Sequence, residues 1–247
     1  MLFRSQASSE MIRLISLDAW NTMLRLDLIT RAIAGRLGEW IGVDEELVLR
    51  IMISVYRELK PKWVSGFISD SAIVDVAQQV LSEKLRISRD VVSRAVEDAF
   101  KTMDLHELVY PDVWSALEGL SKEFKLAVVS NVFYWPGRLT RMVIESVGLS
   151  QFLDAQIYAD EVGVAKPDRR IFMRLCDALG ILSEEAAHVG DELIEDIGGA
   201  ISSGMKAILI KRGVRRSTII GELGLAIIPS LSDLRYALIM LQQYAET

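Results

Sequence analysis

Apolar and polar residues change their spacing along this 247-residue chain, and the changes predict its elements. Residues 11–17 (MIRLISL) form a short apolar run rich in β-forming residues, which stops abruptly at Asp18. From about residue 26 to residue 103, apolar residues recur every three or four positions, which is typical of amphipathic helices. Two such helix faces are formed by Ile29, Ile33, Leu37 and Ile41 and by Leu47, Ile51, Val55 and Leu59. This stretch contains no convincing strand.

Beyond Tyr110, short apolar runs alternate with helical patterns. The predicted strands are 126–129, 155–158, 186–189, 206–210 and 225–228, and the predicted helices are 113–122, 137–147, 168–179, 193–203 and 232–244. Strands joined by helices of about a dozen residues indicate right-handed βαβ units and a parallel sheet with helices on both faces. We therefore predict an α/β fold, in which residues 11–25 and 105–247 form a doubly wound parallel sheet. Residues 26–104 are predicted to form an inserted all-helical cap domain, and residues 1–10 a loose polar tail.

Composition narrows the function classes. The chain is 51% hydrophobic and 25% charged, as a folded globule is and a disordered chain is not. A net charge of −6 argues against nucleic acid as the main partner. The single cysteine, Cys176, excludes an internal disulfide and a zinc site built from cysteines. No apolar run approaches the roughly 20 residues that span a bilayer, and the first ten residues do not resemble a secretory signal. We expect a cytoplasmic protein.

Polar side chains follow four of the predicted strands, at the edge where open α/β sheets bind ligands. In chain order these segments are 18–22 (DAWNT), 130–131 (SN), 166–168 (KPD) and 190–192 (GDE), with Asp196 about one turn further on. An aspartate at a strand end can act as a nucleophile. Lys166 and a Mg²⁺ ion held between Asp18, Asp191 and Asp196 would neutralise an anionic substrate, because carboxylate oxygens suit that ion. The hydroxyls of Thr22 and Ser130 can donate to the oxygens of a transferring group.

These segments, in this order and with a helical insert after the first, resemble the motifs of the haloacid dehalogenase (HAD) superfamily. The resemblance covers residues 11 to about 210. It implies that Asp18 is the nucleophile and that Lys166, Thr22 and Ser130 bind the transferring group or orient the nucleophile. Asn131 and Trp20 are further candidates for contact with the substrate. The implied metal ligands are Asp18, Asp191, Asp196 and the backbone carbonyl of Trp20. The cap would close over the site and select the substrate.

One position departs from the pattern of the phosphatases in this superfamily. Those enzymes carry a second aspartate two residues after the nucleophile, as general acid and base, and this chain has Trp20 there. An indole N–H donates a hydrogen bond but does not exchange a proton near neutral pH. Loss of a general acid typically costs about 10² to 10⁴ in rate. Asn21 replaces a customary glycine, a milder change because asparagine tolerates a left-handed backbone. Glu192 is the nearest acidic substitute, although the direction of the helix is expected to point it elsewhere.

An aromatic residue at position 20 is similar to the Asp-x-Tyr-Gly-Thr motif of the 2-haloacid dehalogenases. Halide leaves without a proton, and these enzymes work without a metal. They use a cap arginine to hold the substrate carboxylate, for which Arg50 and Arg57 are candidates, and Phe172 stands near the position of a tyrosine. The acidic segment around Asp191 does not fit that group.

Three hypotheses follow for the function. The leading one is Mg²⁺-dependent hydrolysis of a small phosphorylated compound through an aspartyl-phosphate, with a rate lowered by Trp20. The alternatives are a metal-independent 2-haloacid dehalogenase and a non-catalytic HAD-like binding protein. The two enzymes would act on a small-molecule substrate, and the binding protein would hold a phosphorylated ligand or a partner. Nucleic acid and membranes are not expected as partners, and the sequence does not fix the oligomeric state. Read singly, His188 and Cys176 are packing residues.

Overall fold

A computed structural model of the protein describes residues 11–245, and the predicted tail at residues 1–10 lies outside these described residues. Seven strands form one sheet in the order β3-β2-β1-β4-β5-β7-β6, parallel except for β6. The strands are β1 (Leu14–Leu17), β2 (Lys125–Ser130), β3 (Ala155–Tyr158), β4 (Ala186–Gly190), β5 (Lys206–Ile210), β6 (Thr218–Ile220) and β7 (Leu225–Ile228). The strand order reverses at β1, between β2 and β4, which makes this the point where open α/β sheets bind ligands. The α/β fold predicted from the sequence is confirmed.

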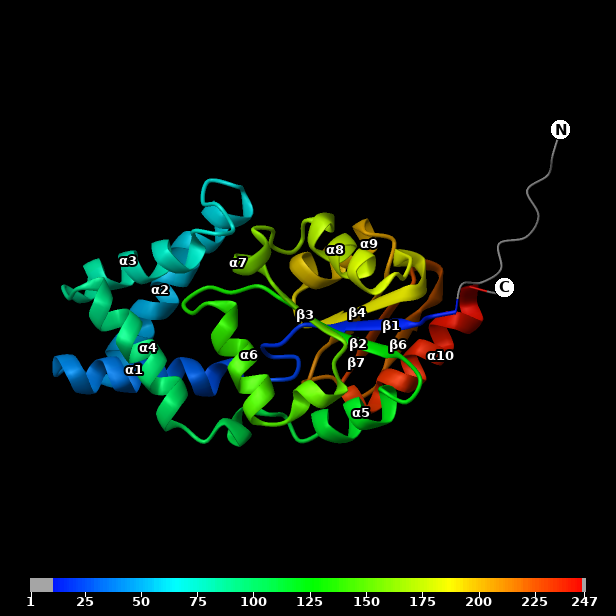
Figure 1. The fold of residues 1–247 in the computed structure, drawn as a ribbon, viewed down its shortest axis with the longest axis horizontal. Coiled ribbons are helices and arrows are strands. Elements are labelled where there is room, and N and C mark those ends of the chain that lie inside the picture. Colours follow the sequence, from blue (N-terminus) through cyan, green and yellow to red (C-terminus); the bar gives the residue numbers. More distant parts are fainter. Residues whose placement is uncertain (1–10, 246–247) are drawn as a thin grey trace.

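Helices cover both faces of the sheet (Figure 1). One face carries α8 (Arg169–Leu179) and α9 (Gly199–Ser202), and the other carries α5 (Val113–Leu120) and α10 (Leu234–Ala245). Two further helices, α6 (Gly137–Ser146) and α7 (Ala159–Val162), follow β2 and the edge strand β3 in the chain. Because both faces are covered, all four residues of β1 are buried, and so are all five of β4.

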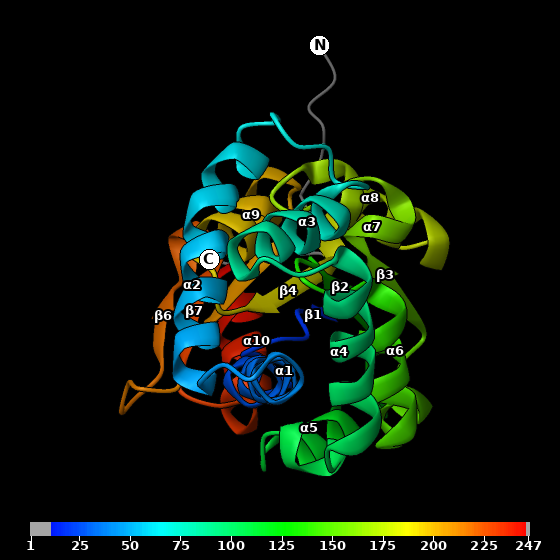
Figure 2. The same cartoon turned by 90° about the vertical axis from the view of Figure 1, so that its left-hand side faces the viewer.

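Four more helices pack together beyond the carboxyl ends of the strands (Figures 1 and 2). They are α1 (Leu26–Ile41), α2 (Glu45–Val64), α3 (Ile73–Leu85) and α4 (Arg89–Thr102). The turn between α1 and α2 is well specified, since Gly42 adopts a left-handed conformation after α1 and the Asp44 side chain accepts from the backbone N–H of Leu47. Two short crossing segments join this helical part to the sheet and pair through an antiparallel bridge between Leu24 and Val109. The exact division into core and cap domains stays a prediction.

Several local predictions need correction. The first strand starts at Leu14 instead of residue 11. Leu47 is 43% exposed, because a strict four-residue repeat drifts around a 3.6-residue helix. The buried face of α2 consists instead of Val48, Leu49, Met52, Val55, Leu59 and Trp63. The helix predicted at 193–203 is a π-helical segment, Leu193–Gly198, followed by α9. Strand β6 and the one-turn helix α7 were not predicted, because each is too short to show a periodicity.

Candidate active site

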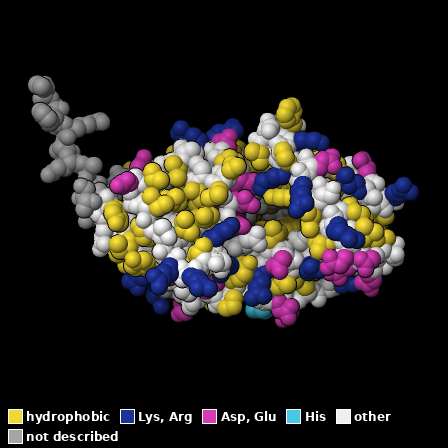
Figure 3. Space-filling view, turned by 180° about the vertical axis from the view of Figure 1, so that it is seen from behind, with side chains coloured by type: hydrophobic (Ala, Val, Ile, Leu, Met, Phe, Trp, Pro, Cys, Tyr) yellow, Lys and Arg dark blue, Asp and Glu magenta, His cyan; other side chains and the backbone are white. Residues whose placement is uncertain are grey.

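A cavity of about 320 Å³ lies between the carboxyl ends of the strands and the cap helices. From behind, the surface is visibly hollowed between the two parts of the molecule (Figure 3). The cavity is lined by seven of the residues proposed from the sequence, namely Asp18, Trp20, Ser130, Asn131, Lys166, Asp191 and Asp196. Their side chains come from four different βα connections. The structure therefore brings together residues that lie up to 178 positions apart in the chain.

Lys166 forms the centre of the polar wall. Its ammonium group donates to Oδ1 of Asp18 and to Oδ1 of Asp196, both at 2.6 Å. All three side chains are at least nine-tenths buried. Burial alone would lower the pKa of Lys166, but the two carboxylates raise it above its usual value, so the lysine is charged. This ammonium is placed to neutralise negative charge that gathers at Asp18.

Asn131 holds Lys166 in place through the backbone. Its Nδ2 donates to the carbonyl oxygen of Lys166 and its Oδ1 accepts from the N–H of Lys166, both at 2.9 Å. The amide is thus paired on both ends with protein groups. The geometry favours a role for Asn131 in positioning Lys166 over the direct substrate contact expected from the sequence.

His188 and Ser16, on the neighbouring strands β4 and β1, hold the side chain of Asp196 in place. His188 Nε2 lies 3.0 Å from Oδ1 of Asp196, and its Nδ1 lies 2.7 Å from Oγ of Ser16. Burial lowers the pKa of His188, so the imidazole is neutral. Burial raises the pKa of Asp196, but Lys166 and His188 hold it well below its usual value. The ionised Asp196 must accept, so Nε2 carries the proton and Nδ1 accepts from Ser16. His188 is therefore more than a packing residue.

Asp18 and Asp191 lie in this group without enough cations to balance both carboxylates. Burial, together with Asp196 and Asp191, raises the pKa of Asp18 to about 8 against the effect of Lys166. Burial and Asp196 raise the pKa of Asp191 to about 6, although Asn21 Nδ2 donates to it at 3.2 Å. Asn21 reaches this position from a left-handed backbone, with φ of 60°. The ionised forms of Asp18 and Asp191 are therefore disfavoured by burial and by neighbouring carboxylates, and a divalent cation would stabilise them.

The donor set fits Mg²⁺, but in a smaller form than the sequence suggested. Both oxygens of Asp196 accept from protein donors, since Oδ2 also receives the backbone N–H of Glu192 at 2.9 Å. Within residues 11–245, no three histidine, cysteine or acidic side chains are arranged to hold a metal. Because both of its oxygens are already paired with protein donors, the geometry counts against Asp196 as a ligand. Asp18, Asp191 and the backbone oxygen of Trp20 remain candidates, and Mg²⁺ commonly uses one or two carboxylates with water and substrate phosphate.

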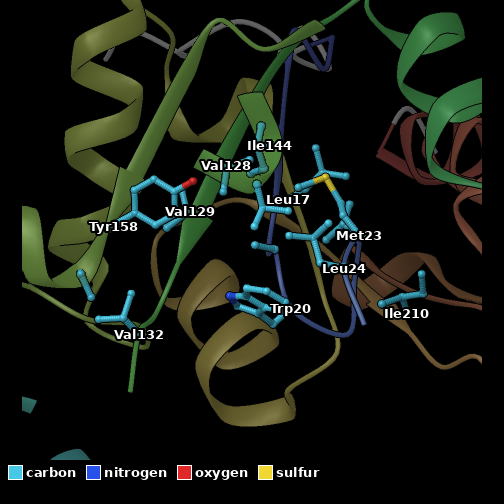
Figure 4. Packing of buried hydrophobic residues seen from close by; sticks show 14 of the residues in the cluster. Leu17, Trp20, Met23, Leu24, Val128, Val129, Val132, Ile144, Tyr158 and Ile210 are labelled. Carbon is cyan, nitrogen blue, oxygen red and sulfur yellow. The ribbon is translucent and has the colours of Figure 1, made fainter. Parts of the chain in front are cut away.

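Trp20 lies directly beyond β1, with its ring against the buried cluster of the sheet (Figure 4). Its indole N–H donates to Oγ1 of Thr140 on α6 at 3.2 Å, and the N–H of Trp135 donates to the same oxygen at 3.2 Å. The rings of Trp20 and Trp135 meet edge to face, 5.1 Å apart. Trp20 thus presents an apolar ring to the cavity, and its one donor is already paired with Thr140.

Other sequence-based candidates lie differently from what was expected. Thr22 is fully buried outside the cavity lining, and its hydroxyl has no partner among the described residues. Ser130 does line the cavity, with its hydroxyl 3.2 Å from the carbonyl of Asn131. Glu192, expected to point elsewhere, also lines it. Arg50 and Arg57 are exposed and do not line it, so neither is placed to hold a substrate carboxylate.

Two groups were missed by the sequence analysis. Arg212 donates to the carbonyl of Thr22 at 2.7 Å and stacks on Tyr110, which anchors the loop after β1. It follows β5, one strand end that was not read for polar residues. Lys60 on α2 lies 2.6 Å from Oε1 of Glu195 in the π-helical segment. Burial alone would lower the pKa of Lys60, but Glu195 raises it, and the pair joins cap to core inside the cavity.

We expect Lys60→Met to loosen the cap. The substitution leaves the buried Glu195 carboxylate without its ammonium partner, which disfavours the closed arrangement. Amide hydrogen exchange in α2 should rise about tenfold. Lys62→Met on the same helix removes only an exposed pair with Glu58 and should leave exchange unchanged. Equal exchange in the two variants would mean that Lys60 does not hold the cap.

A pH dependence follows from the raised pKa values of Asp18 and Asp191. Each is raised from 3.8, to about 8 and about 6, so the folded protein binds more protons than the unfolded chain in this interval. This contribution to stability is present below pH 3.8 and is lost as the pH rises through about 8. The urea midpoint of the metal-free protein should therefore fall between about pH 5 and pH 8. Mg²⁺ should restore it at pH 8, and a midpoint that rises with pH instead would contradict the expectation.

Comparison with known proteins agrees with this geometry. Residues 12–204 match the family described as haloacid dehalogenase-like hydrolase. The chain belongs to this family. Among solved structures, the putative HAD-hydrolase YfnB from Bacillus subtilis, bound to magnesium, superposes with a TM-score of 0.73 at 16% identity, covering 92% of this chain and 99% of that one. The L-2-haloacid dehalogenase from Xanthobacter autotrophicus gives 0.69 at 18%, covering 94% and 100%. These two show that the HAD fold is shared.

Curated relatives of this HAD hydrolase carry both phosphatase and dehalogenase names. The glyceraldehyde 3-phosphate phosphatase of Methanopyrus kandleri is 38% identical over 108 residues, which are 42% of this chain and 44% of the relative. The phosphoserine phosphatase of Thermus thermophilus is 33% identical over 142 residues, 56% and 55% of the two chains. The match thus spans about half the length of these phosphatases. (S)-2-haloacid dehalogenase 4A of Burkholderia cepacia is 25% identical over 203 residues, 81% and 84%.

No helix among residues 11–245 is long and apolar enough to cross a membrane.

Proposed function

We propose that this HAD hydrolase is a Mg²⁺-dependent phosphatase that forms an aspartyl-phosphate on Asp18. The observation that carries the proposal is the meeting of Asp18, Lys166 and Asp191 at one end of the cavity. The phosphatase names among the relatives support it. A bound Mg²⁺, held by Asp18, Asp191 and the backbone oxygen of Trp20, would supply positive charge to the phosphoryl oxygens.

Residues of the chain serve three further roles, in nucleophilic attack, in charge stabilisation and in positioning. Asp18 attacks phosphorus in its ionised form, which a bound Mg²⁺ would favour, and Lys166 stabilises the negative charge that develops on the phosphoryl oxygens. The hydroxyl of Ser130 lies in the same cavity and donates to one of these oxygens. Asp196, fixed by His188, keeps Lys166 in place. Water then hydrolyses the acyl phosphate, which returns Asp18 and inorganic phosphate.

Phosphate release tests the proposal. Acetyl phosphate, aryl phosphates and alkyl phosphates are incubated with the protein, once with Mg²⁺ and once with a chelator. We expect release with Mg²⁺ and at least a 100-fold (~10²) loss with chelator, because the carboxylates then repel the substrate. Absence of release from every compound in the presence of Mg²⁺ would refute the proposal.

A 2-haloacid dehalogenase is the second candidate. Trp20 stands where phosphatases have an acid, and the departure of a halide needs no acid. The charge of the cavity opposes it. Five carboxylates line the cavity against two cations, Lys60 and Lys166, and both cations are already paired with carboxylates. None of the lining residues is an arginine. Chloride release from 2-chloropropionate in the presence of chelator would establish this activity instead.

A further inference from the structure

Part of the wall of the cavity is strongly aromatic. The chain has 5 Trp, 6 Tyr and 7 Phe residues. A third of them line this one cavity: Trp20, Tyr56, Trp63, Phe133, Tyr134 and Trp135. Phe133 contacts two of these rings, with its ring centre 4.8 Å from that of Tyr56 and 6.2 Å from that of Trp63. Such a concentration calls for an account beyond helix packing, because several of these rings come from the loop after β2 and not from a helix.

The polar atoms of these aromatic residues are paired with the protein. Trp20 and Trp135 donate to Thr140, and the N–H of Trp63 donates to Asp70 at 2.8 Å. The hydroxyl of Tyr134 donates to the carbonyl of Met52 at 2.5 Å. These four rings therefore present hydrocarbon to the cavity. Phe133 and Tyr56 are the less buried members, so their rings have surface left for a ligand. A flat apolar group fits this wall better than a sugar or a chain of hydroxyls.

The absence of a proton donor at position 20 also favours a substrate with an aromatic leaving group. The N–H of Trp20 is held by Thr140, and an indole does not supply a proton. The leaving oxygen must therefore depart without a proton from this position. A phenol-type oxygen, with an acidity near that of a tyrosine side chain (pKa about 10), leaves far more easily than an alkoxide, whose acid is about as weak as water.

We infer that the substrates of this enzyme are phosphate monoesters of phenol-type hydroxyl groups, with the aromatic ring of the leaving group against Phe133 and Tyr56. The inference rests on the proposed phosphatase function and names its substrate class. A carboxylate oxygen of Asp18 forms the bond to phosphorus while the bond from phosphorus to the aryl oxygen breaks. The aryl oxide departs with that electron pair and takes a proton from solvent. Water then cleaves the acyl phosphate on Asp18, which gives inorganic phosphate and the free carboxylate.

A leaving-group series tests the acid–base half of the inference. Phosphate esters of phenols of graded acidity are compared with ethyl phosphate, all with Mg²⁺. We expect kcat/KM to rise steeply with the acidity of the phenol, and ethyl phosphate to be at least about 10²-fold slower than phenyl phosphate. Trp20→Asp should flatten this dependence and gain activity on ethyl phosphate. Equal rates on alkyl and aryl esters in the wild-type enzyme would overturn the inference.

A second variant tests the ring contact. Phe133→Leu keeps an apolar side chain but removes the ring, and should raise KM for phenyl phosphate about threefold to tenfold. Its KM for acetyl phosphate, which has no ring, should stay the same. Phe152→Leu removes a ring that packs on Trp114 outside the cavity and should change neither value. An equal change on both substrates, or none on either, would show that the rings do not bind the leaving group.

The outcomes separate this inference from the function on which it rests. Mg²⁺-dependent release from acetyl phosphate and ethyl phosphate at similar rates to phenyl phosphate leaves the phosphatase standing and removes the aryl preference. No release from any of the three removes both.

Discussion

Asp18→Asn is expected to lower phosphate release by about 10⁴-fold or more, the largest loss of activity among single substitutions in this protein. The carboxamide has nearly the shape of the carboxylate, but it is uncharged and does not attack phosphorus. Lys166 keeps its second partner, Asp196, so the fold of the site is retained. The measurement is kcat on phenyl phosphate, together with the mass of the acid-quenched protein. Only the wild-type enzyme should gain the mass of one phosphoryl group.

The matched control is Asp160→Asn. Asp160 accepts from the backbone N–H of Gly137 at 3.0 Å at the start of α6 and does not line the cavity. This variant should keep wild-type activity. Unfolding in urea separates chemistry from folding, because removal of the raised-pKa group at position 18 should not lower the stability of the metal-free protein at pH 8. A phosphoryl adduct that persists in Asp18→Asn would place the nucleophile elsewhere.

Much of the sheet could be predicted because its strands are short apolar runs bounded by polar residues. Strands β3, β5 and β7 have the predicted bounds. Once the strands are parallel and in one sheet, their carboxyl ends share an edge, so Asp18, Lys166 and Asp191 could be expected to meet. The same logic correctly placed Asp196 beside them, since it lies one turn into the segment after β4.

The rest depended on packing between segments that no local pattern relates. Lys60 and Glu195 form a pair because the fold brings α2 and the π-helical segment to the same cavity, and neither residue is unusual on its own helix. The hydrogen-bond partner of the Trp20 N–H could not be predicted, because it is Thr140 on α6, far away in the chain. His188 could be recognised as buried, but its contact with Asp196 follows from the π-helical turn, which directs that carboxylate back toward β4.

Lys166→Met is the substitution with the largest expected effect on stability. It removes the ammonium from two buried carboxylates, Asp18 and Asp196, which are 2.6 Å away. At pH 8 we expect the free energy of unfolding to fall by about 3–5 kcal/mol. The loss should shrink as the pH falls. In Lys166→Met no ammonium opposes the effect of burial, so the pKa values of both carboxylates are raised and both groups are protonated in the folded variant at low pH. Urea unfolding at pH 5 and pH 8 measures this difference.

Lys206→Met provides the comparison, since Lys206 is a partly buried lysine at the start of β5 and lies outside the cavity. Its stability should change little, and by the same amount at both pH values. Activity of Lys166→Met should fall by about 10³-fold even under conditions where it is folded, because the charge on the phosphoryl oxygens is no longer balanced. If Lys166→Met and Lys206→Met were equally stable at pH 8, the two carboxylates would already be neutral in the folded protein. That result would contradict the assignment of Lys166 as the ammonium that balances Asp18 and Asp196 in the folded protein.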